Sequence, residues 1–193
     1  FLIFFPIFDI IASNFFLKID DRTCYVLEKH YYELKKNCSG RQQFKSSFPI
    51  INVKTDKYGL RTNKTRDKEN KKEKILFFGD SMTFGVGIDY KKTFVGLLED
   101  KFTNYDFYNF GVGSYSPSVH LYKLELAIKN KLLPKKIILM LDLSDIYDEG
   151  KRWVDTNDNS KPLLTYDTSK NWKPDKKFTH KNFQISRLIA SKL

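Results

Sequence analysis

The chain has 193 residues, 41% of them hydrophobic, which is enough for one ordinary domain with a core plus an appendage and excludes a disordered chain. Its formal net charge of +11 comes from basic residues that are spread along the chain and mixed with Asp and Glu. Because they form no basic stripe, and no zinc finger, RNA-recognition sheet or basic zipper is present, we interpret them as a solvated surface and expect no nucleic-acid partner.

The first 19 residues form an almost continuous apolar stretch, FLIFFPIFDIIASNFFLKI, about the length that crosses a hydrocarbon core. Asp9 near its middle costs about 2.5–3.5 kcal/mol on insertion scales, a cost that the surrounding Phe, Ile and Leu residues can outweigh. The stretch predicts a membrane anchor over residues 1–19, with a signal peptide's apolar region or a buried core helix as alternatives. Since it begins with Phe rather than Met, we expect the natural start to precede it.

Residues 20–73 are predicted to be a stem and a lead-in segment. Five apolar residues of segment 20–36 suggest a short helix. They are Tyr25, Leu27, Tyr31, Tyr32 and Leu34. Segment 49–53 is predicted to be a short strand. The Lys-, Asn- and Thr-rich run 54–74 is predicted to be a surface segment, within which residues 58–61 dock on the domain that follows.

Cys24 and Cys38 are the two cysteines of the chain. Their spacing matches neither a CxxC metal knuckle nor a redox motif. In an oxidising compartment a bond between them would close a loop of roughly 15 residues and stabilise the fold by about 3 kcal/mol. Two unpaired thiols are the alternative.

From residue 74 the pattern changes to alternating strands and helices, which indicates an α/β domain over residues 74–193. Apolar runs predict parallel strands at 75–78, 105–110 and 137–141, and the last run is wholly apolar, as in a central strand. Each strand is followed by a polar turn. Because ligands bind outside the carboxyl ends of the strands in an open parallel sheet, these three turns are the predicted site.

Two helices are predicted between these strands. The first spans residues 93–102 and packs one face on the sheet. The residues expected on that face are Phe94, Leu97, Leu98 and Phe102. The second begins after Ser116 as N-cap and Pro117 in the first turn, and it continues through Ile128.

The turn after the first strand reads Gly79-Asp80-Ser81-Met82-Thr83-Phe84-Gly85. Ser81 would lie at the carboxyl edge of the sheet, where the start of the next helix leaves backbone N–H groups free to stabilise an oxyanion. A serine there is a weak nucleophile until a base accepts its proton. The alternative is that Asp80 and Ser81 only cap a helix.

The other two turns also carry polar or glycine-rich runs. The second reads Asn109-Phe110-Gly111-Val112-Gly113-Ser114, and the third reads Asp142-Leu143-Ser144-Asp145 with Asp148 and Glu149 close behind. A glycine-rich connection without chemistry is the alternative for the second turn. The third admits an oxyanion or substrate contact, a structural turn or a divalent cation site, because a hydroxyl can donate one hydrogen bond and clustered carboxylates bind hard cations.

These turns resemble the motifs of the SGNH/GDSL hydrolase family over residues 74–149. GDSMTFG resembles the family's opening GDSxTxG motif, and the run from Asn109 resembles its NxGxxG block with Ser114 in place of the last glycine. In the third turn Ser144 stands where the family carries an asparagine before its aspartate. The resemblance implies a three-layer α/β/α sandwich with a parallel, flavodoxin-like sheet, preceded here by the membrane anchor.

The resemblance also implies residue roles. Ser81 would be the nucleophile, and the oxyanion hole would comprise the backbone N–H groups of Ser81 and Ser114 with the hydroxyl of Ser144. The supporting residues would be Asp80, Gly113 and Asp145. No cofactor and no metal is implied.

The Asp-x-x-His element that supplies the family's base is absent from the chain. His30 precedes the domain, His120 lies in the predicted second helix, and His180 follows Asp175 at the wrong spacing. We interpret all three as surface or cap histidines. The expected aspartate and histidine lie beyond residue 193, so the hydrolase domain is expected to be truncated at its C-terminus.

The sequence therefore predicts a membrane-anchored, extracytoplasmic serine esterase that acts on acyl or acetyl esters of envelope carbohydrate or lipid. An O-acyltransferase would use the same nucleophile with a sugar hydroxyl as acceptor. The alternative from another class is a non-catalytic glycan-binding or assembly module of the cell envelope.

Overall fold

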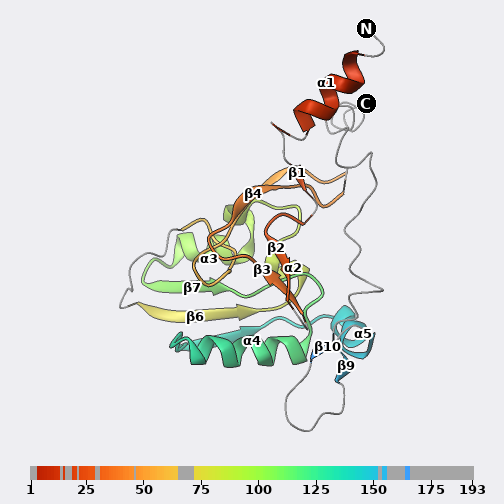
Figure 1. The fold of residues 1–193 in the computed structure, drawn as a ribbon. Helices are drawn as coiled ribbons and strands as arrows, with labels where there is room; N and C mark the ends of the chain where they lie inside the picture. The colour runs from red at the N-terminus through yellow and green to blue at the C-terminus, as the bar shows by residue number, and fades with distance from the viewer. Residues whose placement is uncertain are drawn as a thin grey trace.

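The computed structural model describes residues 4–13, 15, 19–20, 22–28, 31–45, 47–64, 72–151, 154–155 and 164–165. A parallel three-stranded sheet is packed with helices, and the N-terminal strands form a second three-stranded sheet and an antiparallel pair (Figure 1). The predicted α/β class is confirmed.

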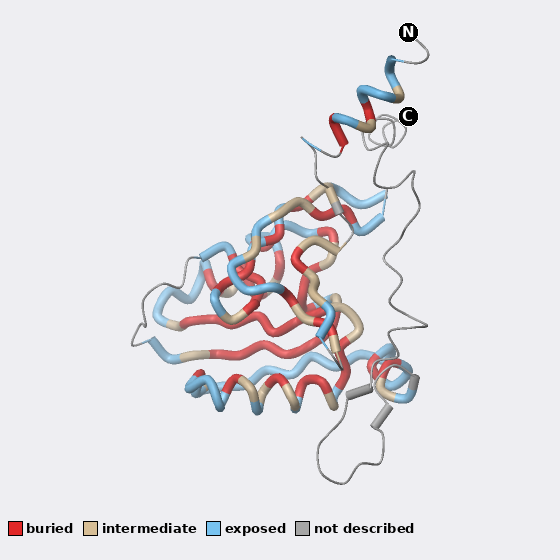
Figure 2. Tube along the Cα trace, in the orientation of Figure 1, coloured by how far each residue is buried: buried red, intermediate tan, exposed pale blue. Residues whose placement is uncertain are grey.

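The central sheet consists of β6 (Glu73–Phe78), β7 (Tyr105–Asn109) and β8 (Lys136–Leu139), all parallel, in the order β7-β6-β8. The three predicted strands are confirmed within two residues at their ends. The prediction that the third is central was wrong. β8 lies at an edge of the described sheet, and all four of its residues are exposed (Figure 2). Its apolar sequence predicted burial, but none of the described elements covers it.

Helices α3 (Phe94–Lys101) and α4 (Pro117–Lys129) confirm the two predicted helices and pack against opposite faces of β6. Alternate residues of the strand point to each side, as the period of a β-strand requires. Ile75 and Phe77 belong to the cluster with α3, whereas Leu76 and Phe78 belong to the cluster with α4.

The predicted sheet-facing side of α3 was partly wrong. Val95 is its fully buried residue, while Leu97 is 57% exposed and Phe102 just beyond the helix is 41% exposed. Phe94 and Leu98 are partly buried against the core, as expected. The helix is therefore rotated from the orientation that its largest apolar residues suggest.

The predicted helix in segment 20–36 was wrong, because this segment forms the antiparallel strands β2 (Tyr25–Leu27) and β3 (Tyr32–Leu34). Residues alternate along β3: Tyr32 and Leu34 are buried, and Glu33 between them is half-buried on the other side. A disulfide joins Cys24 to Cys38, with their Cα atoms 5.7 Å apart, which decides the question that the sequence left open.

A second small sheet contains β1 (Ile19–Asp20), β4 (Ser39–Gln42) and β5 (Ile51–Lys54), with β4 in the middle. β5 confirms the predicted short strand, whereas β1 and β4 were not predicted. Val53 and Leu34 from these N-terminal strands share one buried cluster with Phe84, Tyr115 and Val119 of the region after residue 74. Residues on both sides of the predicted domain boundary thus form one core.

Helix α1 (Phe4–Ala12) lies within the predicted anchor, and its exposed apolar residues include Phe4 and Phe8. Asp9 is buried and accepts a hydrogen bond from the Ser13 hydroxyl at 3.0 Å. Among the described residues, none of the helices has both the length and the apolar character needed to span a membrane. The anchor over residues 1–19 stays a prediction.

Beyond residue 151 the structure describes the short antiparallel pair β9 (Val154–Asp155) and β10 (Leu164–Thr165). His30, Asp175 and His180 lie outside the described residues.

Candidate active site

Ser81 is the first residue of the short helix α2 (Ser81–Phe84), directly beyond the carboxyl end of β6. Asp80 is the N-cap, and its carboxylate accepts a hydrogen bond from the Met82 backbone N–H at 2.8 Å. The Ser81 hydroxyl is half-buried and donates to the other carboxylate oxygen of Asp80 at 3.2 Å. The capping function that the sequence allowed for both residues thus belongs to Asp80, which leaves the Ser81 hydroxyl at the edge of the sheet.

The C-terminal end of α2 is fixed by Arg61, from the run that was predicted to dock on the domain. That docking is confirmed, and Arg61 is fully buried. Its guanidinium donates to the carbonyl oxygens of Phe84, Gly85 and Ile88 and lies 4.5 Å from the centre of the Phe84 ring. Burial lowers the pKa of Arg61 to about 10, so the side chain stays charged at neutral pH.

The turn after β7 is attached to α2 through Asn109, which is 1% exposed. Its side-chain amide donates to the Thr83 carbonyl at 2.9 Å and accepts from the Gly111 N–H at 2.9 Å. A Cβ at Gly111 would lie 2.4 Å from the Phe84 backbone nitrogen, so only glycine permits this approach. Asn109 and Gly111 therefore hold the second turn against the helix that carries Ser81.

In the second turn, Gly113 lies beside Ser81, and Ser114 follows it in the chain. A Cβ built on Gly113 would lie 3.9 Å from the Ser81 Cβ, so the two residues are neighbours. Ser114 has φ of 59°, in the left-handed region that favours glycine. On the N-terminal side, the Tyr32 hydroxyl donates to the Gly113 carbonyl, and the Tyr115 hydroxyl donates back to the Tyr32 carbonyl.

The turn after β8 leads into α5 (Leu143–Lys151) and is held by hydrogen bonds within itself. Both the backbone N–H and the hydroxyl of Ser144 donate to Asp142 Oδ1 at 2.6 Å. The Asp142 N–H donates to Asp145 Oδ2 at 3.1 Å. The Ser144 hydroxyl is therefore directed to Asp142 in this arrangement.

Three carboxylates gather where this turn meets the first. One side-chain oxygen from each of Asp80, Asp142 and Asp145 lies within 4.8 Å of the others, and Asp142 is the exposed member. The Ser144 hydroxyl, which donates to Asp142, holds the pKa of that carboxyl below its usual range. Burial raises the pKa of Asp145, and the charges of Asp142 and Asp80 add to this shift. The cluster fits the donor set of a hard divalent cation and equally a mutually capped turn.

The structure thus brings the three predicted turns together at one edge of the sheet. Gly113 lies beside Ser81, and Asp80 lies beside Asp142 and Asp145. The arrangement follows from the order β7-β6-β8, because β6 runs between the other two strands and all three end at the same edge. In the doubly wound folds with this strand order, ligands bind at the carboxyl end of the first strand, where the connections diverge.

His120, interpreted from sequence as a surface or cap residue, is instead buried, and that interpretation was wrong. Its ring packs against the rings of Phe78 and Tyr115 with centroids 6.1 and 6.2 Å away. Burial lowers its pKa to about 4, against the opposing charge of Glu149. A neutral imidazole of such low basicity is a poor base at neutral pH.

The N-terminus of α4 is capped from α5 rather than by its own N-cap side chain. Glu149 accepts hydrogen bonds from the Ser116 hydroxyl at 2.6 Å and from the backbone N–H and hydroxyl of Ser118. A carboxylate at this position is favoured by the helix dipole. Sequence analysis missed this contact, together with the Arg61 and Tyr32 contacts, because each joins residues more than 20 positions apart.

No protein-family model matches the chain, and no curated protein matches it significantly.

Proposed function

We propose that the chain is part of a serine esterase of the SGNH/GDSL type, with Ser81 as its nucleophile. One observation carries the proposal: the three motif-bearing turns converge, with Gly113 beside Ser81 and the third turn's carboxylates beside Asp80. The parallel sheet with helices on both faces is consistent with the three-layer α/β/α sandwich of that family. The left-handed backbone of Ser114 also supports the proposed register, in which the family carries glycine.

In the proposed mechanism the Ser81 hydroxyl attacks the ester carbonyl, and the backbone N–H groups of Ser81 and Ser114 donate to the oxyanion that forms. The Ser144 hydroxyl would have to leave Asp142 to contribute a third donor. We assign the base to a histidine outside the described residues, because His120 is enclosed between aromatic rings and its pKa is about 4. No cofactor is needed for this chemistry.

We propose a substrate class of acyl or acetyl esters on envelope carbohydrate or lipid, with the protein held at the membrane through residues 1–19. The Cys24–Cys38 disulfide supports an extracytoplasmic location, since such bonds persist in oxidising compartments. Transfer of the acyl group to a sugar hydroxyl proceeds through the same acyl-enzyme, so an O-acyltransferase is the close relative of this proposal.

A non-catalytic glycan-binding or assembly module is favoured by one feature. The third turn places two carboxylates, those of Asp142 and Asp145, beside Asp80, and its Ser144 hydroxyl is already bonded, where an oxyanion would need donors. A binding module would tolerate that arrangement.

The two classes are separated by labelling the full-length protein with a serine-directed phosphonate. We expect stoichiometric labelling and ester hydrolysis in the wild type, and a loss of both in Ser81→Ala, because a triad serine contributes about a millionfold to kcat. Thermal stability should change little, since Asp80 and not Ser81 is the N-cap. The matched control is Ser47→Ala, which removes an exposed hydroxyl elsewhere. Full activity in Ser81→Ala would refute the mechanism, and a wild type that neither labels nor hydrolyses any acyl ester would favour the module.

A further inference from the structure

A surface pocket of about 440 Å³ lies between the N-terminal strands and the C-terminal half of α4. This volume falls within the range of about 300–1,000 Å³ typical of small-ligand sites. Its floor is apolar, because Phe110, Ala127 and Leu132 belong to the core on that face of the sheet. The pocket is separate from the Ser81 turn: none of residues 79–85 lines it, and its part of α4 starts at Lys123, whereas the helix begins at Pro117.

Two tyrosines contribute to the lining, and each is held in place by a second aromatic ring. Tyr31 packs edge-on against Tyr122 with ring centroids 5.2 Å apart, and Tyr58 packs edge-on against Tyr108 at 6.2 Å. Such rings present rigid apolar surface together with a hydroxyl at the tip.

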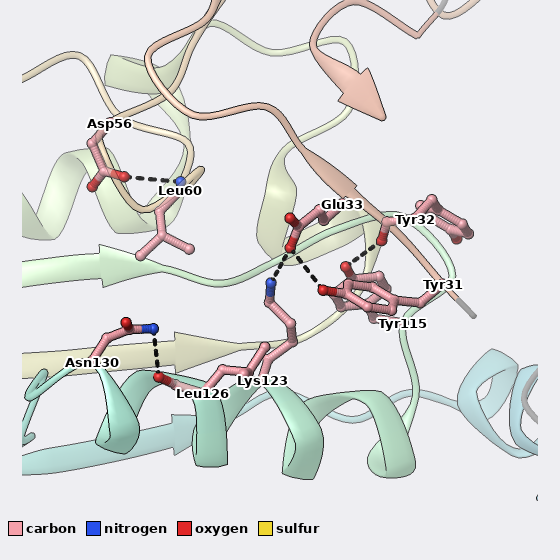
Figure 3. Close-up of polar contacts among 9 residues, drawn as sticks. All are labelled: Tyr31, Tyr32, Glu33, Asp56, Leu60, Tyr115, Lys123, Leu126 and Asn130. Carbon is pink, nitrogen blue, oxygen red and sulfur yellow. Dashed lines mark hydrogen bonds and ion pairs between the residues drawn. The ribbon is translucent and has the colours of Figure 1, made fainter. Parts of the chain in front are cut away.

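The charged lining consists of three lysines and one glutamate. Lys123 pairs with Glu33 at 2.6 Å, and the two side chains are only 11% and 22% exposed. Glu33 also accepts a hydrogen bond from the Tyr31 hydroxyl at 3.3 Å, so the pair is fixed from both sides (Figure 3). Lys36 and Lys57 are exposed, and among the described residues neither has a carboxylate partner.

We propose that this pocket binds an acidic sugar unit. The two lysines without carboxylate partners supply the positive charge for a carboxylate or phosphate on the sugar. The Glu33–Lys123 pair offers an acceptor and a donor for ring hydroxyls, and the tyrosines cover its apolar C–H faces. An acyl chain would need an apolar lining throughout, and the four charged side chains of this lining do not provide one. The choice of a sugar among small anions rests on the proposed function.

The pocket and the Ser81 turn share one structural element, β3. Tyr32 on this strand donates to the Gly113 carbonyl beside Ser81, while Glu33 next to it faces the pocket. Residues on opposite sides of one strand therefore contact the two sites. An acidic glycan held in the pocket would be anchored to the same strand that fixes the second turn.

The test is saturation-transfer difference NMR on the full-length protein, titrated with glucuronate, with glucose and with inorganic phosphate. We expect saturable binding of glucuronate, no measurable binding of glucose, and weaker competition by phosphate. Lys57→Gln should weaken glucuronate binding about fivefold, the upper range for one exposed ion pair. Lys91→Gln, which removes the same charge from an exposed position outside the pocket, should leave the affinity unchanged.

Ser81→Ala should bind glucuronate as the wild type does, so this result is independent of whether the protein hydrolyses esters. Equal effects of Lys57→Gln and Lys91→Gln would show that only the net charge matters and would overturn the proposal. Equal affinity for glucose would contradict the requirement for an acidic group. Full competition by phosphate at equal concentration would contradict recognition of the sugar ring. Absence of saturable glucuronate binding would reject the site even if Ser81 proves to be the nucleophile.

Discussion

The two strands beside β6 hold their turns in opposite ways. On the β7 side the turn is buried, and Asn109, Gly111 and Gly113 connect it to α2 and to Tyr32 by direct contacts. On the β8 side the strand is exposed, Leu143 is 86% exposed, and the turn is bonded chiefly to itself. The turn after β7 is thus fixed by its surroundings, and the turn after β8 by its own carboxylates.

This difference assigns different chemistry to the two sides. A backbone N–H that is held rigidly needs no reorganisation when charge develops, which is the property of an oxyanion hole. Carboxylates such as Asp142 oppose a nearby oxyanion and favour a cation or a protonated group. In the proposed mechanism the β7 side therefore supplies the Ser114 N–H that joins the Ser81 N–H as oxyanion donor, and the β8 side suits the orientation of a base that becomes positively charged.

The largest effect should come from breaking the β7 side at Asn109. Asn109→Leu removes both hydrogen bonds and leaves the Thr83 carbonyl and the Gly111 N–H unsatisfied. We expect about 2–3 kcal/mol of lost stability from these buried groups. We also expect kcat to fall about a hundredfold, because the second turn would shift relative to Ser81. Chemical denaturation and steady-state kinetics on an acyl ester measure the two effects.

Asn104→Leu is the matched control, since Asn104 is exposed in the turn before β7. It should change stability by less than about 0.5 kcal/mol and leave kcat unchanged. An Asn109→Leu protein that is destabilised yet fully active would show that the second turn does not position the reaction.

Much of this arrangement could be predicted, because the pattern is local. The apolar runs that became β6, β7 and β8 and the motif at Gly79–Gly85 could be recognised from neighbouring residues, and their parallel order places the turns together. The β2–β3 pair could not, because the five residues used for the helix prediction fit a helical spacing as well as a strand. What decides its structure is the disulfide and the contacts of Tyr32 with Gly113 and Tyr115.

The burial of individual residues could not be predicted from the sequence either. Arginine is usually a surface residue, yet Arg61 is enclosed because three carbonyl oxygens of the α2 region accept its hydrogen bonds. His120 resembles an ordinary helix residue until Phe78 and Tyr115 are placed around it. Both depend on which elements meet in three dimensions.

The second prediction concerns His120, which lies near Phe78 at the end of β6 and near Glu149 of α5. Its folded pKa of about 4 lies below the unfolded value of 6.5, so below pH 6.5 the unfolded chain binds a proton that the folded chain does not. Stability should therefore fall between pH 6.5 and 4, by up to about 3 kcal/mol at 1.36 kcal/mol per unit.

His120→Leu should remove this acid-dependent loss while keeping the apolar packing. Urea denaturation of both proteins from pH 7 to 4 gives the comparison, and carboxylates that titrate in the same range cancel in the difference. Identical pH profiles for the two proteins would mean that the imidazole is protonated in the folded state.

The smallest effect is expected on the β8 side, from Ser144→Ala. Removing a donor that contacts the oxyanion usually lowers kcat by about 10²–10³. The Ser144 hydroxyl, however, is exposed and already donates to Asp142 at 2.6 Å, where the negative charge of the acceptor strengthens the bond. We therefore expect kcat to fall less than about tenfold, a smaller loss than in Asn109→Leu. Asp142→Asn removes the negative charge that strengthens the hydrogen bond from the Ser144 hydroxyl. Adding Ser144→Ala to the Asp142→Asn protein should therefore lower kcat more than Ser144→Ala does in the wild type. A loss of a hundredfold or more in the single Ser144→Ala protein would show that the hydroxyl turns to the oxyanion during reaction, and the two sides would then share the oxyanion hole.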